Sequence, residues 1–192
     1  MHSKTQRMIG GTNLNYEALT QNLIGMVKES QIKLGYTKTP IHLYFPAQAI
    51  CHLLDTQASP AQLEQILADF SQSVRDVLGT LTISVKDEMF CITVPEKGVE
   101  YVHDNVETSG FLEEFIACMS KPERTIEDIT AVFRKYSDQV VVQTPNSNTD
   151  EFDYLIYFAD GKPDAYRYCI HDEMGQLIYH RFTQKEFETF GF

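Results

Sequence analysis

The spacing of apolar residues changes abruptly at Gly79, and this change constrains the fold more than any other feature of the sequence. From Leu63 to Leu78 the apolar positions follow the three-to-four spacing of a helix. From Leu81 to Val85 apolar and polar residues alternate, which is the period of a strand. A hairpin partner follows in the next apolar run. The chain therefore passes from a helix directly into a β-hairpin, which predicts an α+β fold with antiparallel hairpins.

The segments before this point have a definite order. An amphipathic helix is expected up to Gly35, and the β-favouring run Ile41–Phe45, bounded by prolines, predicts a strand. Two helices follow, the second of which starts at the Ser59-Pro60 cap. Helix, strand, helix, helix and hairpin is the order of a winged-helix domain. We expect residues 13–94 to form a winged-helix-like unit behind a flexible N-terminal arm at 1–12.

The second half, residues 95–192, is expected to contain helices and an antiparallel β-meander that ends in a short helix. Residues 50–70 and 115–133 share a pattern, an apolar helix end followed by a proline turn, a Ser/Thr cap and a second apolar helix. Two interpretations stay open: a second winged-helix-like unit, or an ordinary α+β domain. In either case we expect this half to pack on the first as one compact body.

The charge of the chain excludes several classes of partner. Its formal net charge is −11, and residues 101–192 carry 8 Lys/Arg against 17 Asp/Glu. The helix that would enter a DNA groove, residues 60–78, has Arg75 as its only basic residue beside three acids. Such a surface repels phosphates, so we expect no nucleic-acid binding. No run approaches the ~20 apolar residues of a membrane span, so no membrane partner is expected either.

The cysteines and the N-terminus indicate where the protein resides. Four cysteines lie at long intervals inside apolar runs, without a Cys-x-x-Cys pair. Buried free thiols are typical of reducing compartments. The first twelve residues lack the apolar segment of a secretion signal. We therefore expect a cytoplasmic protein.

Two stretches carry a resemblance to a known family. They are Pro95–Asp104, which reads PEKGVEYVHD, and Tyr154–Tyr168, which reads YLIYFADGKPDAYRY. In them the chain resembles a small bacterial family of uncharacterised proteins, and the resemblance runs from about residue 14 to the C-terminus. That family has no assigned activity, so the resemblance implies no catalytic residues.

The common catalytic and cofactor motifs are missing from the sequence. It has no glycine-rich nucleotide loop, no Gly-x-Ser-x-Gly elbow and no His-Glu-x-x-His helix, so we expect no cofactor. One alternative is a small hydrolase or a metal-dependent enzyme that uses His171, Asp172 and His180. The metal ligands in that alternative would be Cys169, His171 and His180. We expect the ordinary alternative, a half-buried thiol and surface histidines.

The aromatic C-terminal strands give the strongest indication of function. Residues 152–192 hold 11 of the 22 aromatic residues, with two arginines among them. Tyr and Arg together are typical of protein interfaces, since they offer a large contact area at low entropic cost. A sheet with ordinary tyrosines is the competing interpretation. The expected binding residues are Tyr154, Arg167, Tyr168, Tyr179 and Arg181.

The turn at residues 172–176 sets the expected register of this sheet. A turn with Gly175 in a bulge pairs Asp172 with Gln176 and places Arg167 directly opposite Arg181. Two such charges require a negative group between them: an internal carboxylate from Asp153 or Glu151, an acidic side chain of a partner, or a bound anion. We therefore expect an interaction or regulatory module that binds a protein or a second copy through this sheet, without catalysis.

Overall fold

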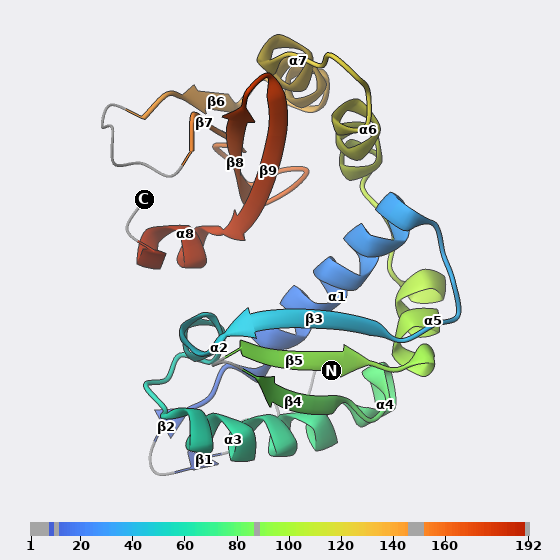
Figure 1. Ribbon diagram of the computed structural model, residues 1–192, viewed down its shortest axis with the longest axis vertical. Helices are drawn as coiled ribbons and strands as arrows, with labels where there is room; N and C mark the ends of the chain where they lie inside the picture. Colours follow the sequence, from blue (N-terminus) through green and yellow to red (C-terminus); the bar gives the residue numbers. More distant parts are fainter. Residues whose placement is uncertain (1–7, 10–11, 87–88, 146–151, 191–192) are drawn as a thin grey trace. The chain divides into compact units, whose positions relative to one another are not determined.

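The computed structural model describes residues 8–9, 12–86, 89–145 and 152–190, which form two compact units (Figure 1). The units divide between Val106 and Glu107. The expected boundary at residue 94 is therefore wrong by one helix. Val99 and Val102 of that helix are buried in the core of the first unit, so it belongs there. Of the expected N-terminal arm, residues 1–7 and 10–11 lie outside the described residues, and the rest forms two short paired strands.

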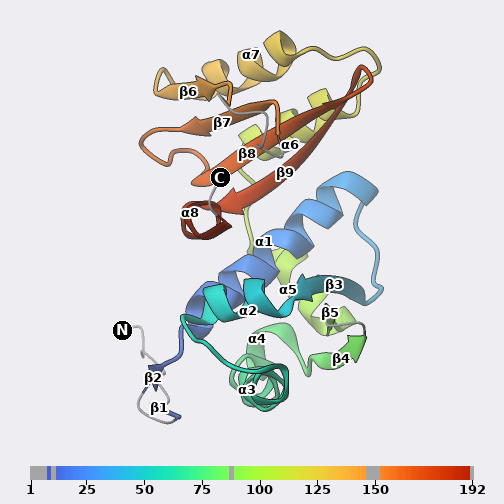
Figure 2. The same ribbon diagram turned by 60° about the vertical axis from the view of Figure 1, so that its left-hand side comes forward.

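From α1 to β5 the first unit has the element order expected from the sequence. Its elements are β1 (Met8–Ile9), β2 (Thr12–Asn13), α1 (Tyr16–Leu34), β3 (Ile41–Pro46), α2 (Ala47–Leu54), α3 (Pro60–Ser73), α4 (Arg75–Leu78), β4 (Thr82–Lys86), β5 (Met89–Val94) and α5 (Glu96–Asn105). Strands β3, β5 and β4 form an antiparallel sheet in that spatial order, so β3 and β4 are its edges (Figure 2). The predicted hairpin is confirmed. That the unit is a winged-helix domain stays a prediction.

Local signals in the sequence set the helix boundaries of this unit. Ser59 caps α3 by accepting a hydrogen bond from the Gln62 N–H, and the Gln62 side chain accepts from the Ser59 N–H in return. Gly79 ends α4 with a φ of +74° and leads the chain into β4. The helices and the inner face of the sheet then share one apolar core, which includes Leu19, Phe70 and Phe90.

The second unit consists of two helices followed by a four-stranded meander and a short helix. Its elements are α6 (Gly110–Met119), α7 (Ile126–Tyr136), β6 (Val140–Gln143), β7 (Tyr154–Phe158), β8 (Tyr166–Glu173), β9 (Gln176–Thr183) and α8 (Gln184–Phe190). The strands pair antiparallel in the order β6-β7-β8-β9. The predicted meander and terminal helix are confirmed. No strand lies between α6 and α7 in residues 120–125, and none lies between α2 and α3 in residues 55–59, so the shared pattern does not distinguish the two interpretations. Four strands follow α7 where two follow α4, and both interpretations of this unit stay predictions.

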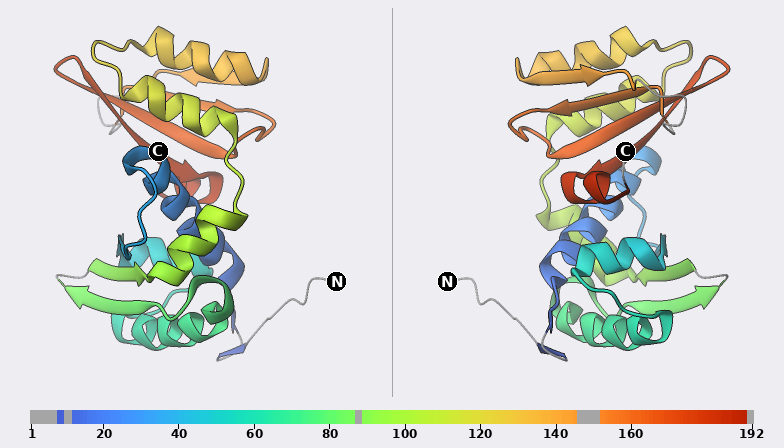
Figure 3. Two further views of the ribbon diagram at one scale, coloured as in Figure 1. Left: turned by 90° about the vertical axis from the view of Figure 1, so that its right-hand side faces the viewer. Right: turned by 90° about the vertical axis from the view of Figure 1, so that its left-hand side faces the viewer.

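Aromatic side chains form the core between this sheet and its two long helices. Figure 3 shows α6 and α7 together on one side of the sheet. Phe111 packs edge-to-face on Phe158, with ring centroids 4.9 Å apart, and Phe115 packs in the same way on Tyr168 at 4.7 Å. On the opposite face, Phe187 of α8 packs with Leu155 and Cys169. The aromatic density of the C-terminal half therefore builds the interior of the unit.

The register of the β8–β9 hairpin differs from the expected one. Glu173 pairs with Gln176, so the turn consists of two residues, Met174 and Gly175, with φ values of +53° and +86°. Two consecutive positive φ values are typical of a type I′ turn, which matches the twist of a hairpin better than the bulged turn does. Methionine rarely adopts this conformation, and for this reason the sequence favoured the bulged turn that pairs Asp172 with Gln176.

This register separates the two arginines that were expected to face each other. Arg167 lies opposite Phe182, and Arg181 lies opposite Tyr168. Because successive residues point to opposite faces of a strand, the two arginines lie on different faces of the sheet. The predicted site for a shared acid between them does not exist.

Candidate functional site

The structure places most of the predicted binding residues in the core of the second unit. Tyr168 is fully buried, with 0% of its surface exposed. Tyr179 packs edge-to-face on Phe115 at 4.8 Å between centroids, and the Arg181 side chain is 7% exposed. A partner cannot reach Tyr168 or the guanidinium of Arg181 without unfolding the unit. Their assignment to an exposed binding face was therefore wrong.

The other two predicted binding residues are partly exposed and lie on different faces of the sheet. Tyr154 pairs with Ile170, on the face that packs against α6 and α7. Arg167 lies on the opposite face, where its guanidinium carbon is 3.7 Å from the ring centroid of Tyr157. This stack occupies the arginine within its own sheet. The five residues do not form a common site.

The residues of the alternative enzyme interpretation are only partly brought together. The rings of His171 and His180 lie edge-to-face, 5.4 Å apart between centroids. Asp172 lies opposite Leu177, on the other face of the sheet, and its carboxylate accepts a hydrogen bond from the Gly175 N–H. Burial raises the pKa of the Cys169 thiol to about 12, which opposes the thiolate that a metal requires. Within the described residues, no three His, Cys, Asp or Glu side chains are arranged to hold a metal.

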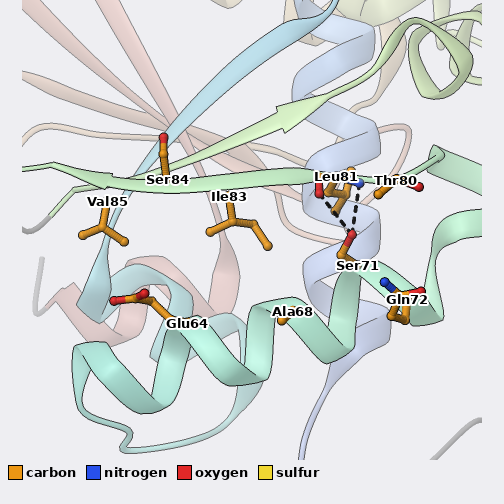
Figure 4. Close-up of a pocket in the computed structure, with 9 residues that line it drawn as sticks. All are labelled: Glu64, Ala68, Ser71, Gln72, Thr80, Leu81, Ile83, Ser84 and Val85. Atoms are coloured by element: carbon orange, nitrogen blue, oxygen red, sulfur yellow. Dashed lines mark hydrogen bonds between the residues drawn. The ribbon is translucent and has the colours of Figure 1, made fainter.

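A groove in the first unit offers the more accessible site. It lies between α3 and the edge strand β4 and has a volume of about 600 Å³. Figure 4 shows its lining: Glu64 and Ala68 project from α3, Ile83 and Val85 point from β4 toward the helix, and Ser84 points the other way. The remaining lining residues are Ser71, Gln72, Thr80 and Leu81. Apolar side chains thus form the strand side of the groove, and polar groups stand at its ends.

The hydrogen-bonding groups of β4 are directed by its pairing with β5. The Leu81 N–H and C=O groups bond to the Ser71 hydroxyl and so point away from β5. Alternate residues of an antiparallel strand direct these groups to the same side, so those of Thr82, Ser84 and Lys86 point to β5. The backbone N–H and C=O groups of Ile83 and Val85 therefore point away from β5, toward the outer edge of the sheet.

At Leu81 the Ser71 side chain supplies the hydrogen-bond partners of the outer edge. The Leu81 N–H donates to the Ser71 Oγ at 3.0 Å, and the Ser71 hydroxyl donates to the Leu81 carbonyl at 3.2 Å. One side chain thus makes the two bonds that a neighbouring strand would make at Leu81. Beyond it, at Ile83 and Val85, no strand in the described part of the chain pairs with this edge.

This site was not predicted from the sequence, because each residue that lines it is also typical of an ordinary helix or strand. Leu81, Ile83 and Val85 carry the alternation of any half-buried strand, and Ala68 is a good helix former. Only the pairing order shows that β4 is an edge, and only the packing shows that the small Ala68 leaves space beside it.

The comparisons with known proteins identify a family. A family model described as "Domain of unknown function, E. rectale Gene description (DUF3877)" matches residues 16–191. The chain belongs to this family, and the resemblance to an uncharacterised bacterial family is thereby confirmed. Searches of curated proteins and of solved structures found no match. Among the described residues, no helix has the length and apolar character that a membrane span requires.

Proposed function

We propose that this member of the DUF3877 family is a protein-interaction module that binds an extended peptide segment in the groove between α3 and β4. The segment would add to the sheet as a further strand, bonding to the backbone groups of Ile83 and Val85. Strand addition at a sheet edge is a common mode of peptide recognition, in which main-chain bonds give affinity and pockets give specificity. The observation that carries the proposal is the open edge of β4 beside an open groove.

The charge of the chain favours a protein partner over nucleic acid or an anionic membrane. At a net charge of −11 the surface repels phosphate groups. Exposed edge strands also pair readily with other polypeptides, and proteins usually protect them. An edge left open beside a groove is therefore better explained by a peptide partner than by any other class.

A cytoplasmic location is part of the proposal. Cys51, Cys91, Cys118 and Cys169 are all free thiols. Reduced cysteines are the usual state in the cytoplasm, whereas secreted proteins of this size commonly form disulfides.

The proposal is tested by selecting peptides on the full chain. A phage-displayed library of random ten-residue peptides is selected on the wild type and on Ala68→Trp, in which the indole fills the groove. Ala131→Trp on α7, at an exposed helical position of the second unit, is the matched control. We expect enriched peptides on the wild type and on Ala131→Trp, and a loss of at least about tenfold in affinity on Ala68→Trp, as for a blocked hot spot.

A second variant tests the strand-addition geometry directly. Val85→Pro removes an N–H that points away from β5, so it spares the β4–β5 ladder while deleting one bond to an added strand. Selected peptides should bind this variant more weakly, and on the wild type they should shift the amide NMR signals of Ile83 and Val85. Peptides that bind Ala68→Trp and Val85→Pro as tightly as the wild type would refute the proposal.

A further inference from the structure

We infer that the segment bound in the α3–β4 groove is basic, with a Lys or Arg side chain paired to Glu64 and an apolar side chain over Ala68. This inference rests on the proposed function and adds the chemistry and the register of the partner. It follows from the direction of α3 relative to β4, from the end of the groove at Ser71, and from the charge of its lining.

Helix α3 runs antiparallel to β4 along the groove. Figure 4 shows Glu64 beneath Val85, Ala68 near Ile83, and Ser71 beneath Leu81. Side chains four residues apart on a helix are separated by about 6 Å along its axis. Alternate residues of a strand are about 6.8 Å apart. The helix-facing side chains of an added strand would therefore match successive turns of α3, with one beside Ala68 and the next beside Glu64.

Ser71 defines one end of the bound segment. Its hydroxyl already bonds to both backbone groups of Leu81, so an added strand must end before that residue. The segment thus pairs with Ile83 and Val85, which fixes which of its side chains lies near which turn of α3. A register shift by one residue would turn its apolar side chains away from the groove.

Charge then decides the nature of the segment. Glu64 is exposed and is the one ionisable residue among the nine that line the groove. A Lys or Arg beside it gains an ion pair, whereas an Asp or Glu is repelled by Glu64.

The test compares charge preference across three proteins. The ten-residue peptide library is selected in parallel on the wild type, on Glu64→Lys and on Asp69→Asn, which removes an acid of α3 outside the groove lining. Lys and Arg should be enriched at one position on the wild type and on Asp69→Asn, and Asp and Glu at that position on Glu64→Lys. For a matched Lys/Glu peptide pair, Glu64→Gln should weaken the Lys peptide by about two- to fivefold, the range of an exposed ion pair.

The outcomes separate this inference from the proposed function. If Glu64→Lys selects the same basic peptides as the wild type while Ala68→Trp abolishes binding, the inference of a basic partner is wrong. Peptide binding in the α3–β4 groove is then still supported. If Ala68→Trp also binds the peptides unchanged, the proposal that they bind in the α3–β4 groove is wrong. Sedimentation of the wild type as a dimer that Val85→Pro dissociates would assign the edge to a second copy and overturn the basic-peptide inference.

Discussion

The carboxylate of Asp164 lies 3.7 Å from the guanidinium of Arg181, and both side chains are more than nine-tenths buried. The same Oδ2 accepts a hydrogen bond from the Tyr168 hydroxyl at 3.1 Å, and Oδ1 accepts from the Tyr166 N–H at 2.8 Å. The arginine also stacks on the Tyr166 ring, 4.3 Å from its centroid. The residues that looked like a binding face are thus a polar network that closes one side of the aromatic core.

Replacing Asp164 with Asn should therefore lower the free energy of unfolding. It removes the charge of one partner in a buried ion pair, a change that typically costs about 3–5 kcal/mol in unfolding free energy. Urea denaturation followed by circular dichroism measures this loss. The control is Asp138→Asn at an exposed position, which should change stability by no more than about 0.5 kcal/mol. Equal effects of the two substitutions would show that the buried pair has no special role.

The β8–β9 turn offers a stabilising substitution. Met174 is fully exposed and has a φ of +53°, a conformation that costs roughly 1–2 kcal/mol for an ordinary side chain. Asn-Gly is the preferred pair for such a turn, so Met174→Asn should stabilise the unit by about 1 kcal/mol. Differential scanning calorimetry should show a higher Tm for this variant and a lower one for Gly175→Ala. A lower Tm for Met174→Asn would mean that Met174 makes a contact that outweighs the strain.

The same turn shows how far the sequence could predict this protein. Helix caps and apolar periods act locally, so Ser59, the Ser/Thr cap within residues 115–133 and the alternation after Gly79 identified elements that the structure confirms. Register depends on one turn conformation, and Met174 adopts a conformation its side chain disfavours. Because this turn changes the register, Arg181 lies in the core and not on the outer face, where it was expected.

The candidate site escaped prediction for a different reason. An edge strand is defined by what lies beside it, and the pairing of β4 with β5 on one side only is a property of the whole sheet. Aromatic residues attract attention in a sequence because they serve both cores and interfaces. Here Phe111, Phe115 and Tyr168 pack on one another inside the second unit, whereas the groove of the first unit is lined by small side chains such as Ala68 and Val85.

Gly98 of α5 should not tolerate a side chain, because α5 packs too closely against its neighbours at this position. A Cβ at position 98 would lie 2.4 Å from the Leu78 carbonyl oxygen and 2.7 Å from Val94 Cγ1. Gly98→Ala must therefore separate α5 from α4, and overpacking of this kind costs about 1–3 kcal/mol. Gly110→Ala is the comparison, since its Cβ would meet only the Tyr136 side chain, at 3.3 Å or more. Urea midpoints should fall clearly for Gly98→Ala and by less for Gly110→Ala.

The chain should bind duplex DNA weakly if at all. Helix α3, which would face a DNA groove in a winged-helix domain, carries Glu64 and Asp69 and has no Lys or Arg. Neutralising few phosphates releases few counterions, so affinity and salt dependence should both be low. Fluorescence anisotropy with a labelled random duplex at 50 and 200 mM salt checks this. Submicromolar affinity that falls steeply with salt would contradict the prediction.

The four thiols should divide into two classes of reactivity. Cys51 and Cys91 are partly exposed, whereas Cys118 and Cys169 are buried and burial raises the pKa of both thiols. Since the thiolate is the reactive form, Ellman's reagent at pH 8 should modify the first pair rapidly and the second pair only after denaturation. Mass spectrometry of the digested protein assigns the modified sites. Rapid modification of Cys169 would show that its surroundings open readily.

Cys169 should also make stability fall at alkaline pH. Its thiol has a pKa of about 12 in the folded protein and about 9 when unfolded, so between these values the folded state keeps a proton that the unfolded state has lost. Unfolding then releases protons, and the free energy of unfolding decreases as pH rises through this window, by about 1 to 2 kcal/mol from pH 9 to 10.5. Cys169→Ala removes the titrating group while preserving a small apolar side chain. Its urea midpoint is expected to start lower at pH 8 but to decline less steeply than that of the wild type; parallel declines would mean that the thiol titrates normally in the fold.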